Sequence, residues 1–406
     1  MTYLIAAAGL VVLVFLHELG HFTVARLVGM RPRSFYVGFP PALVKVKRNG
    51  IEYAIGLIPL GGMVQLPGMN RPAARDLRVF LEPALREDPS LVPAVGAVRR
   101  ALEAEDYDAA RLAGEELERK VAAAPLTPAA RRSAGRALKE VEDGTSPEAY
   151  WRGATWKRVA VIAAGPFANI LVAFVILFLV FAISGGPSNR AVVGKVIKGT
   201  PAAASGLKAG DRILAIDGLP VSFDTVSPTI QSTQGRPLTI TVLRNGEQVT
   251  VGPRRAAKVP GGWQFGFEAA APLVPYSTSR AASAAGSNLA GVVTDTGRGL
   301  GGLFSSRGRS QLSGPVGILE VSQQQLQAGA PYYFMILAFV SMSLALLNLL
   351  PLLPLDGGHI LFSLIEAVRR RALAREVYER VSVVGFALVL LLFVIASSND
   401  FSGGPH

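Results

Sequence analysis

Two histidines and a glutamate near the N-terminus have a spacing that could hold a metal ion. His17, Glu18 and His21 form the pattern H-E-x-x-H. On a helix, histidines four residues apart share one face and can bind one metal ion, with the intervening glutamate beside it. The pattern is typical of zinc hydrolases. It therefore predicts zinc-dependent hydrolysis.

The segment that carries this pattern is apolar. No charged residue occurs between Tyr3 and Leu16, and the apolar stretch extends from Tyr3 to about Val24. That length is sufficient for a helix to cross a bilayer. A signal peptide is disfavoured, because the segment lacks a basic leading region and its apolar run ends in His-Glu instead of a small-residue cleavage site. We therefore expect a retained membrane helix, with the zinc chemistry inside the bilayer.

A catalytic zinc site needs a third protein ligand. The chain has no cysteine and only four histidines, so this ligand must be a carboxylate or His359. Asp356 is the acid at the end of a later apolar segment, where an unpaired carboxylate is costly and a metal would explain its presence. Prolines and glycines around it break the helix, which predicts irregular backbone lining an enclosed cavity. The alternative is that Asp356 caps a helix and His359 is the ligand.

The composition fits a membrane protein with at least one aqueous domain. Half of the 406 residues are hydrophobic and only 17% are charged. We assign the net charge of +12 to cytoplasmic loops. Nucleic-acid binding is disfavoured, since no arginine–aromatic patch is present. Four segments are apolar enough to span a membrane, at residues 3–24, 159–183, 332–352 and 381–396.

Loop charges predict the orientation of these segments. The short loop between the third and fourth segments is arginine-rich, with Arg369, Arg370, Arg371, Arg375 and Arg380. Basic residues also lie at both ends of the loop between the first two segments: Arg26, Arg31, Arg33, Arg152, Lys157 and Arg158. Both loops are expected to be cytoplasmic. The termini and the residues between the second and third segments are then extracytoplasmic. The active site is expected toward the cytoplasmic side of the inner membrane.

Two further regions follow the first apolar segment. Asn49-Gly50 lies between alternating stretches and predicts a type I′ hairpin. Its glycine-rich continuation, residues 55–66, either dips into the membrane interface or packs on a cytoplasmic domain. Residues 72–147 have helical spacing and many charges, which predicts a helical cytoplasmic insertion without an assigned function.

Residues 190–271 predict a compact extracytoplasmic domain. The expected order is strand, short helix, strand and hairpin, and the stretch GLKAGDRILAIDG resembles part of a PDZ domain. PDZ domains bind extended peptides by strand addition, so a peptide or substrate tail is an expected partner. The alternative is a spacer or size filter. The Ala-, Gly- and Ser-rich residues 272–330 predict an amphipathic connector that begins with a surface helix and continues in a Gly/Ser loop.

Together these features resemble the site-2 protease family of intramembrane zinc metalloproteases, and its bacterial regulator-of-sigma-E type in particular. The resemblance rests on HELGH, on GPFAN at Gly165 to Asn169, on the PDZ-like insert and on NLLPLLPLDGGH, and it excludes the insertion near 72–147. The chain departs from the family at position 353, where a proline is expected and Leu353 is present. Bacterial members often carry two PDZ domains, whereas one is predicted here.

The resemblance implies that Zn²⁺ is held by His17, His21 and Asp356, with Glu18 as the catalytic base. Zinc would lower the pKa of a bound water toward about 7 and polarise the scissile carbonyl. Glu18 would take the water's proton and deliver it to the leaving amine. The expected enzyme is a zinc metalloendopeptidase.

The resemblance also points to residues that contact substrate. Asn348 is linked to substrate accommodation. Asn169 is a candidate for positioning substrate and, equally, for packing between helices. Gly61 and Gly62 belong to a strand that could hold an unwound substrate extended by β-addition.

The expected substrates are single-span membrane proteins of the anti-sigma factor or remnant signal peptide type. Two other interpretations remain open. One is a non-proteolytic receptor or chaperone with structural zinc, and the other is a metal transporter. A transporter has no need of Glu18 between the two histidines.

The predicted fold is therefore a multi-pass α-helical membrane protein with about four transmembrane helices, a membrane-associated β-hairpin, a cytoplasmic helical insertion and one extracytoplasmic PDZ-like α/β domain. The expected segments are residues 1–30 (first transmembrane helix), 31–70 (hairpin region), 71–150 (insertion), 157–184 (second transmembrane helix), 190–271 (PDZ-like domain), 272–330 (connector), 331–365 (third transmembrane helix) and 381–397 (fourth).

Overall fold

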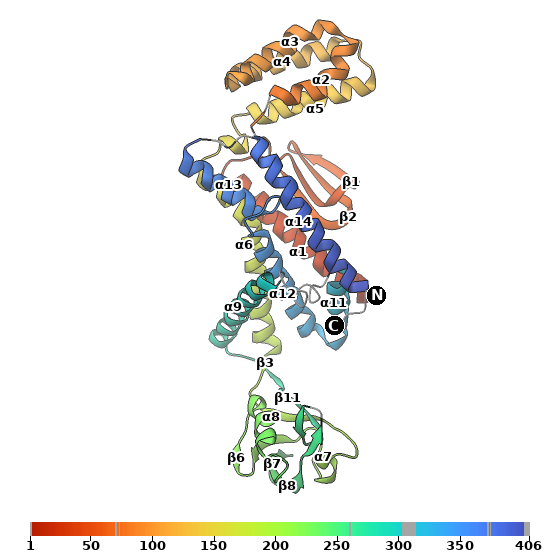
Figure 1. The fold of residues 1–406 in the computed structure, drawn as a ribbon, viewed down its shortest axis with the longest axis vertical. Helices are drawn as coiled ribbons and strands as arrows, with labels where there is room; N and C mark the ends of the chain where they lie inside the picture. The colour runs from red at the N-terminus through yellow and green to blue at the C-terminus, as the bar shows by residue number, and fades with distance from the viewer. Residues whose placement is uncertain are drawn as a thin grey trace. The chain divides into compact units, whose positions relative to one another are not determined.

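The computed structural model has two compact units (Figure 1). The first comprises Met1–Phe174 and Leu289–His406, and the second comprises Val175–Asn288. The structure describes residues 2–69, 71–72, 74–259, 261–302, 314–371, 373 and 375–401. Residues 303–313 of the predicted connector lie outside the described residues.

Four helical segments in the described part of the chain are long and apolar enough to cross a membrane. They lie in α1 (Thr2–Leu27), α6 (Thr155–Leu179, extended to Ser184 by a π-helical turn), α12 (Ala330–Asn348) and α14 (Arg375–Phe401). They coincide with the four apolar segments of the sequence. The fourth is longer than predicted, because its first helical turns are charged and add no apolar signal.

The region predicted as a third transmembrane helix, residues 331–365, contains two helices. α12 ends at Asn348, and α13 (Asp356–Arg369) begins at Asp356. Pro351 and Pro354 lack the amide donors that a continuous helix requires, so the chain turns between the two helices. Treating this region as one helix was therefore wrong, while the predicted break is present. It puts Asp356 in the first turn of a new helix.

Hydrogen bonds and apolar contacts join α1, α6 and α12. The hydroxyl of Tyr333 on α12 donates to the carbonyl oxygen of Ile5 on α1 at 2.9 Å. Ala6 and Leu13 of α1 pack with Tyr333 and Leu337 in one buried cluster. The Ser341 hydroxyl of α12 donates to the Asn169 carbonyl oxygen of α6 at 2.9 Å. The three helices therefore form one packed group.

A β-hairpin follows α1. β1 (Ser34–Arg48) pairs with β2 (Ile51–Gln65) around Asn49-Gly50, and both turn residues have positive φ, as a type I′ turn requires. Ser34 pairs with both Glu52 and Gln65, so the last part of β2 returns along the other side of β1. Phe35 and Ile51 pack with Phe22, which places the hairpin against α1.

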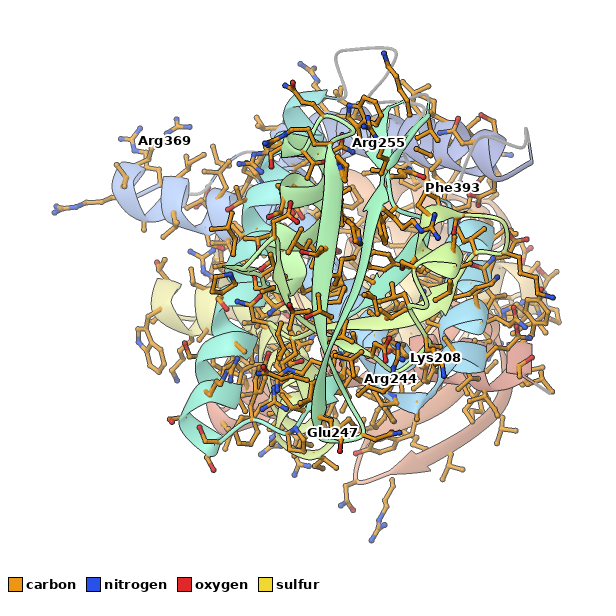
Figure 2. All side chains as sticks on the ribbon, turned by 90° about the horizontal axis from the view of Figure 1, so that it is seen from below. Lys208, Arg244, Glu247, Arg255, Arg369 and Phe393 are labelled. Atoms are coloured by element: carbon orange, nitrogen blue, oxygen red, sulfur yellow. The ribbon has the colours of Figure 1, made fainter. Side chains whose placement is uncertain are left out.

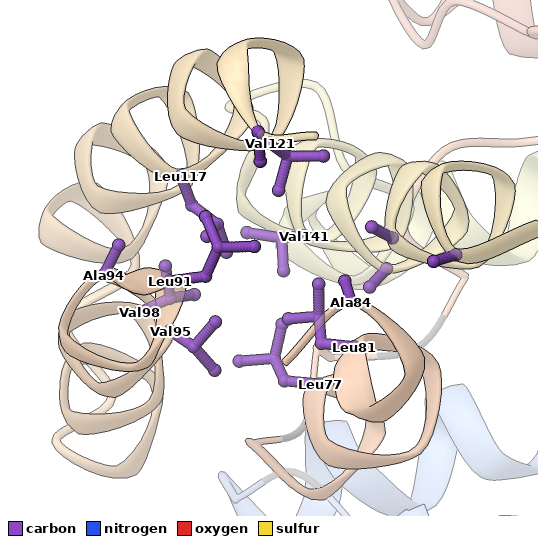
Figure 3. Packing of buried hydrophobic residues seen from close by; sticks show 14 of the residues in the cluster. Leu77, Leu81, Ala84, Leu91, Ala94, Val95, Val98, Leu117, Val121 and Val141 are labelled. Carbon is purple, nitrogen blue, oxygen red and sulfur yellow. The ribbon is translucent and has the colours of Figure 1, made fainter. Parts of the chain in front are cut away.

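The insertion forms four helices, α2 (Ala74–Glu87), α3 (Val92–Glu103), α4 (Tyr107–Ala123) and α5 (Pro128–Thr145). The side chains of Asp106 and Thr127 accept backbone hydrogen bonds at the starts of α4 and α5, as helix caps do. Leu77, Leu81 and Leu117 are almost fully buried in its core (Figure 3). The insertion therefore has a hydrophobic core of its own.

Two helices, α9 (Thr278–Gly302) and α11 (Pro315–Ala328), lie within the region that was predicted as a connector. Asp400 at the end of α14 accepts hydrogen bonds from the amides of Gly314 and Val316 at 2.8 and 3.1 Å. These bonds satisfy free N–H groups at the start of α11. α9 thus lies where a surface helix was expected, whereas α11 was not predicted.

The second unit is built around a sheet. Its strands are β4 (Ala191–Val196), β5 (Arg212–Ile216), β6 (Leu219–Pro220), β7 (Pro237–Arg244), β8 (Glu247–Arg255) and β11 (Phe267–Ala270). The order is β11-β4-β5-β7-β8, with β6 paired to β5. Figure 2 shows Glu247 and Arg255 at the two ends of β8.

Two short helices and two small pairs of strands complete this unit. The helices are α7 (Pro201–Ala204) and α8 (Phe223–Ser232). β9 (Ala257–Val259) pairs with β10 (Gly262–Gln264), and β3 (Gly186–Pro187) pairs with β12 (Leu273–Val274). The apolar faces of the sheet and helices share one buried core that includes Ile213, Val226, Leu238 and Phe265.

A buried ion pair makes the stability of the second unit depend on pH. Asp211 accepts from Arg244 Nε and Nη2 at 2.7 and 2.6 Å and from the Lys208 amide at 2.8 Å; Figure 2 labels Lys208 and Arg244. Burial opposes ionisation, but these bonds outweigh it and lower the pKa of Asp211. The stabilisation is therefore complete above the ordinary aspartate pKa of about 4 and is lost as pH falls through the lower, folded-state pKa.

We expect Asp211→Asn to destabilise the second unit by about 1–3 kcal/mol at neutral pH, because a charge-assisted hydrogen-bond pair is lost. Thermal unfolding of the full chain in detergent, followed from pH 7 down to pH 3, measures the effect. Between pH 7 and pH 3, the stability of the variant should fall less than that of the wild type. An unchanged pH dependence would contradict the assignment.

Candidate active site

Three side chains that can bind a metal converge in the first unit. His17 and His21 lie one turn apart on α1, and Asp356 is the first residue of α13. The two histidine Nε2 atoms are 3.2 Å apart, and Asp356 Oδ2 lies 3.2 Å from His17 Nε2 and 3.4 Å from His21 Nε2. Within the described part of the chain, these atoms form a group that could hold one metal ion.

The geometry of this group fits zinc. Ligand atoms about 2.0–2.1 Å from a tetrahedral zinc ion are about 3.3 Å apart, and the three observed separations are 3.2–3.4 Å. Asp356 Oδ2 is buried and has no hydrogen-bond partner among the described residues. A buried carboxylate oxygen without a donor is costly unless a cation compensates it. Two imidazole nitrogens and one carboxylate oxygen are also a ligand set that zinc prefers.

The helix α6 contacts both histidines. His21 Nδ1 donates to the carbonyl oxygen of Val161 at 2.8 Å. The side-chain amide of Asn169 lies 3.3 Å from His17 Nδ1. Gly165 lies between Val161 and Asn169 on α6, and a methyl group added to it would overlap the His21 ring. The sequence indicated Gly165 and Asn169 through their motif, but it could not indicate Val161, because a backbone carbonyl leaves no mark on residue type.

Glu18 faces the hairpin. Glu18 and Val64 of β2 line the same cavity. A methyl group added to Gly62 would overlap the Glu18 side chain, so the absence of a Cβ there lets β2 pass close to α1. Glu18 is not one of the three converging metal-binding groups. Its carboxylate is therefore available for proton transfer next to them.

A cavity of about 470 Å³ adjoins this group. Its wall includes Gly61 and Gly62 from β2, Asn348 at the end of α12, and His359 on α13. His359 is thus near the site, but it lies outside the group of three side chains. Apolar residues such as Val14 and Leu344 complete the wall. The cavity can therefore hold a short segment of apolar polypeptide beside Glu18.

Asn169 does not line this cavity. Its side chain is fully buried and lies against His17 of α1, while its backbone carbonyl accepts from Ser341 of α12. The structure thus places the Asn169 side chain beside His17, and its role stays a prediction.

An ion pair that the sequence did not indicate links α6 to α13. Arg158 Nη1 donates to Glu366 Oε2 at 2.6 Å, and both side chains are nearly buried. Glu366 lies on the helix that begins with Asp356, and Arg158 lies on the helix that contacts the histidines. The pair therefore helps hold the two parts of the site together. Two charges 208 positions apart in sequence give no sign that they meet.

Comparisons with known proteins show which family the chain belongs to. The family model described as Peptidase family M50 matches residues 5–392. The Zinc metalloprotease RasP of Bacillus licheniformis is 30% identical, over 96% of this chain and 96% of its own length. The Regulator of sigma-W protease RasP of Bacillus subtilis is 30% identical, over 96% of this chain and 95% of its own length. The Probable protease eep of Enterococcus faecalis is 29% identical over 96% of each chain.

The spanning helices, the metal-binding group and these relatives define a membrane-embedded zinc metalloprotease. The chain belongs to peptidase family M50, the site-2 protease family. Zn²⁺ is its expected cofactor. The predicted family, enzyme class and cofactor are thereby confirmed.

Proposed function

We propose that this protein is an intramembrane zinc metalloendopeptidase in which His17, His21 and Asp356 bind zinc and Glu18 is the catalytic base. The observation that carries the proposal is the mutual separation of 3.2–3.4 Å among the three ligand atoms. Glu18 lies next to them on the same helix, at the wall of the cavity. All of these groups belong to helices of the membrane-embedded unit.

Zinc bound at this site would supply a Lewis acid for activating a water and polarising the scissile carbonyl. Glu18 would accept the proton of the attacking water at its carboxylate and return it to the leaving amine nitrogen. The apolar wall would exclude other water from the cavity, which strengthens the electrostatic interactions inside it.

The substrate would bind in an extended form along β2. A peptide bond in a transmembrane helix is hidden by its own hydrogen bonds, so the helix must unwind before cleavage. The strand segment Gly61–Val64 lines the same cavity as Glu18, so it would be the strand to which an extended substrate adds. Asn348, across the cavity, would donate from its amide to a substrate carbonyl.

We propose single-span membrane proteins as the substrates. A relative is named a regulator of sigma-W protease, which favours an anti-sigma factor of the membrane-bound class. Remnant signal peptides have the same single-span architecture and are the second candidates.

The proposed location is the inner membrane, with the active site toward the cytoplasm. Arg369 ends α13, and Arg370 and Arg371 follow it. Lys157 and Arg158 lie in the first turn of α6. Both loops would be cytoplasmic by the positive-inside rule. The insertion would then lie in the cytoplasm. The second unit and both termini would be extracytoplasmic.

We further propose that the second unit is a PDZ-like domain and that the hairpin associates with the membrane. The strand–helix order from β4 to β8 supports the first assignment. A substrate tail would add to the sheet or be screened by size. Exposed apolar side chains on the hairpin support its association with the membrane. Each is more than half exposed and would be covered by lipid: Leu43, Val44, Val46, Ile55 and Leu57.

Zinc removal tests the proposed chemistry. Cleavage of a single-span reporter by the purified protein in detergent should cease after dialysis against a chelator. One equivalent of Zn²⁺ should restore it, and excess Mg²⁺ should not, because imidazole ligands suit zinc. Unchanged cleavage by protein without measurable zinc would refute the proposal. Zinc flux into proteoliposomes without any cleavage would favour a transporter instead.

A further inference from the structure

We propose that Asn169 is a positioning residue for the metal site: its amide oxygen accepts a hydrogen bond from His17 Nδ1–H and so fixes His17 in the tautomer whose Nε2 binds metal. This inference rests on the proposed zinc site. It assigns Asn169 neither to substrate binding nor to simple packing between helices.

His21 illustrates how α6 can set a tautomer. Its Nδ1 lies 2.8 Å from the Val161 carbonyl oxygen. A carbonyl oxygen only accepts, so the proton of a neutral His21 must be on Nδ1. Its Nε2 then carries the free lone pair, and this is the atom that lies 3.4 Å from Asp356 Oδ2. The backbone of α6 thus presents His21 in the form that a metal requires.

His17 needs the same arrangement. Its Nε2 lies 3.2 Å from both His21 Nε2 and Asp356 Oδ2, so this nitrogen faces the metal position. Its Nδ1 must then carry the proton and needs an acceptor. The group next to Nδ1 is the Asn169 amide, at 3.3 Å. A protonated Nδ1 can bond only the oxygen of this amide, so the orientation with Oδ1 toward His17 is the one that fits metal binding.

Burial makes this contact specific. Asn169 is 0% exposed, and its Oδ1 has no hydrogen-bond partner among the described residues when its Nδ2 faces His17. A half-turn of the amide brings Oδ1 to the Nδ1 proton. The Ser341 hydroxyl of α12 donates to the backbone carbonyl of Asn169 at 2.9 Å and makes no use of the side-chain amide. The contact that the amide itself makes is with His17.

Helical spacing explains why one helix serves both histidines. Val161 and Asn169 are eight residues apart, about two turns, and lie on one face of α6. His17 and His21 are one turn apart on α1. Gly165, between the two contact points, leaves space for the His21 ring. This face of α6 therefore orients both nitrogen ligands from outside the metal site.

Two substitutions at Asn169 separate positioning from packing. Asn169→Leu keeps the volume but removes the acceptor, and it should weaken zinc binding by about 10–100-fold, as is usual when an outer hydrogen-bond partner of a metal ligand is lost. Asn169→Asp keeps an acceptor oxygen and should retain zinc affinity within a few-fold. Zinc affinity is measured on the purified full-length chain in detergent by competition with a chromophoric chelator, and thermal unfolding shows that each variant is folded.

Ser341→Ala is the matched control. It removes a buried hydrogen bond to Asn169 but leaves the amide in place, so zinc affinity should stay near the wild-type value. Wild-type affinity in Asn169→Leu, or an equal loss in Ser341→Ala, would overturn the inference. A loss in Asn169→Asp that exceeds the loss in Asn169→Leu would do the same, because packing tolerates leucine better than a buried charge. His17→Ala that binds zinc as well as the wild type would instead refute the proposed zinc site itself.

Discussion

Replacing Glu18 by glutamine is expected to slow cleavage of a single-span reporter by about 10²–10⁴-fold, the range of general acid–base catalysis. The change removes the carboxylate that would take the proton from the attacking water. It leaves the three converging ligand groups intact, because Glu18 is not among them. Zinc content should therefore stay at the wild-type level. Cleavage is measured with purified protein, and zinc by elemental analysis of the same sample.

Two results would contradict the role of Glu18. Cleavage at the wild-type rate by Glu18→Gln would exclude it as the base. Loss of zinc together with activity would mean that Glu18 supports the metal site instead of the proton transfer. Asn348→Ala is a useful comparison, since it changes the cavity wall without removing a titratable group. We expect it to weaken substrate use while zinc remains bound.

Replacing Gly165 by alanine is expected to reduce zinc affinity by at least about 10-fold and cleavage by about 10²-fold or more. The added methyl group would overlap the His21 ring, so His21 must move away from the position that Val161 holds. Displacing one ligand by even about 1 Å can cost that much activity. Zinc competition and reporter cleavage on the same preparation measure both effects.

Gly135→Ala is the matched control for this substitution. Gly135 lies within α5 of the insertion, and a methyl group there meets no atom within 4 Å. Alanine is the better helix former by up to about 1 kcal/mol, so this variant should be as stable as the wild type or more so, with full zinc binding. Normal zinc affinity in Gly165→Ala would show that the contact between α6 and His21 does not determine the site.

Much of the candidate site could be predicted from the sequence, because its residue types are rare in their setting. Histidines four apart must share a helix face, and a carboxylate at apolar depth needs compensation, so His17, His21 and Asp356 could be grouped. The sequence alone could not decide whether Asp356 or His359 is the third ligand, because the answer depends on the turn between α12 and α13. That turn places Asp356 Oδ2, and not the His359 ring, next to both histidines.

The contacts around the site could not be predicted, because they depend on the register between helices far apart in the chain. Nothing local marks the carbonyl of Val161 as the partner of His21, 140 positions away. The pairing of β2 with both sides of β1 was equally hidden. Alternation indicates a strand, but it does not identify the neighbouring strand. The length of α14 was underestimated for a different reason, since only its apolar part carries a signal.

The central claim is that two histidines of α1 and one aspartate of α13 bind a single zinc ion. X-ray absorption at the zinc edge of the purified Glu18→Gln protein tests it most directly, since this variant keeps the ligands and does not consume substrate. We predict two imidazole nitrogens at about 2.0–2.1 Å and carboxylate or water oxygens at about 2.0–2.2 Å. A shell with three imidazoles, which would require His359, or a shell without imidazole would contradict the claim.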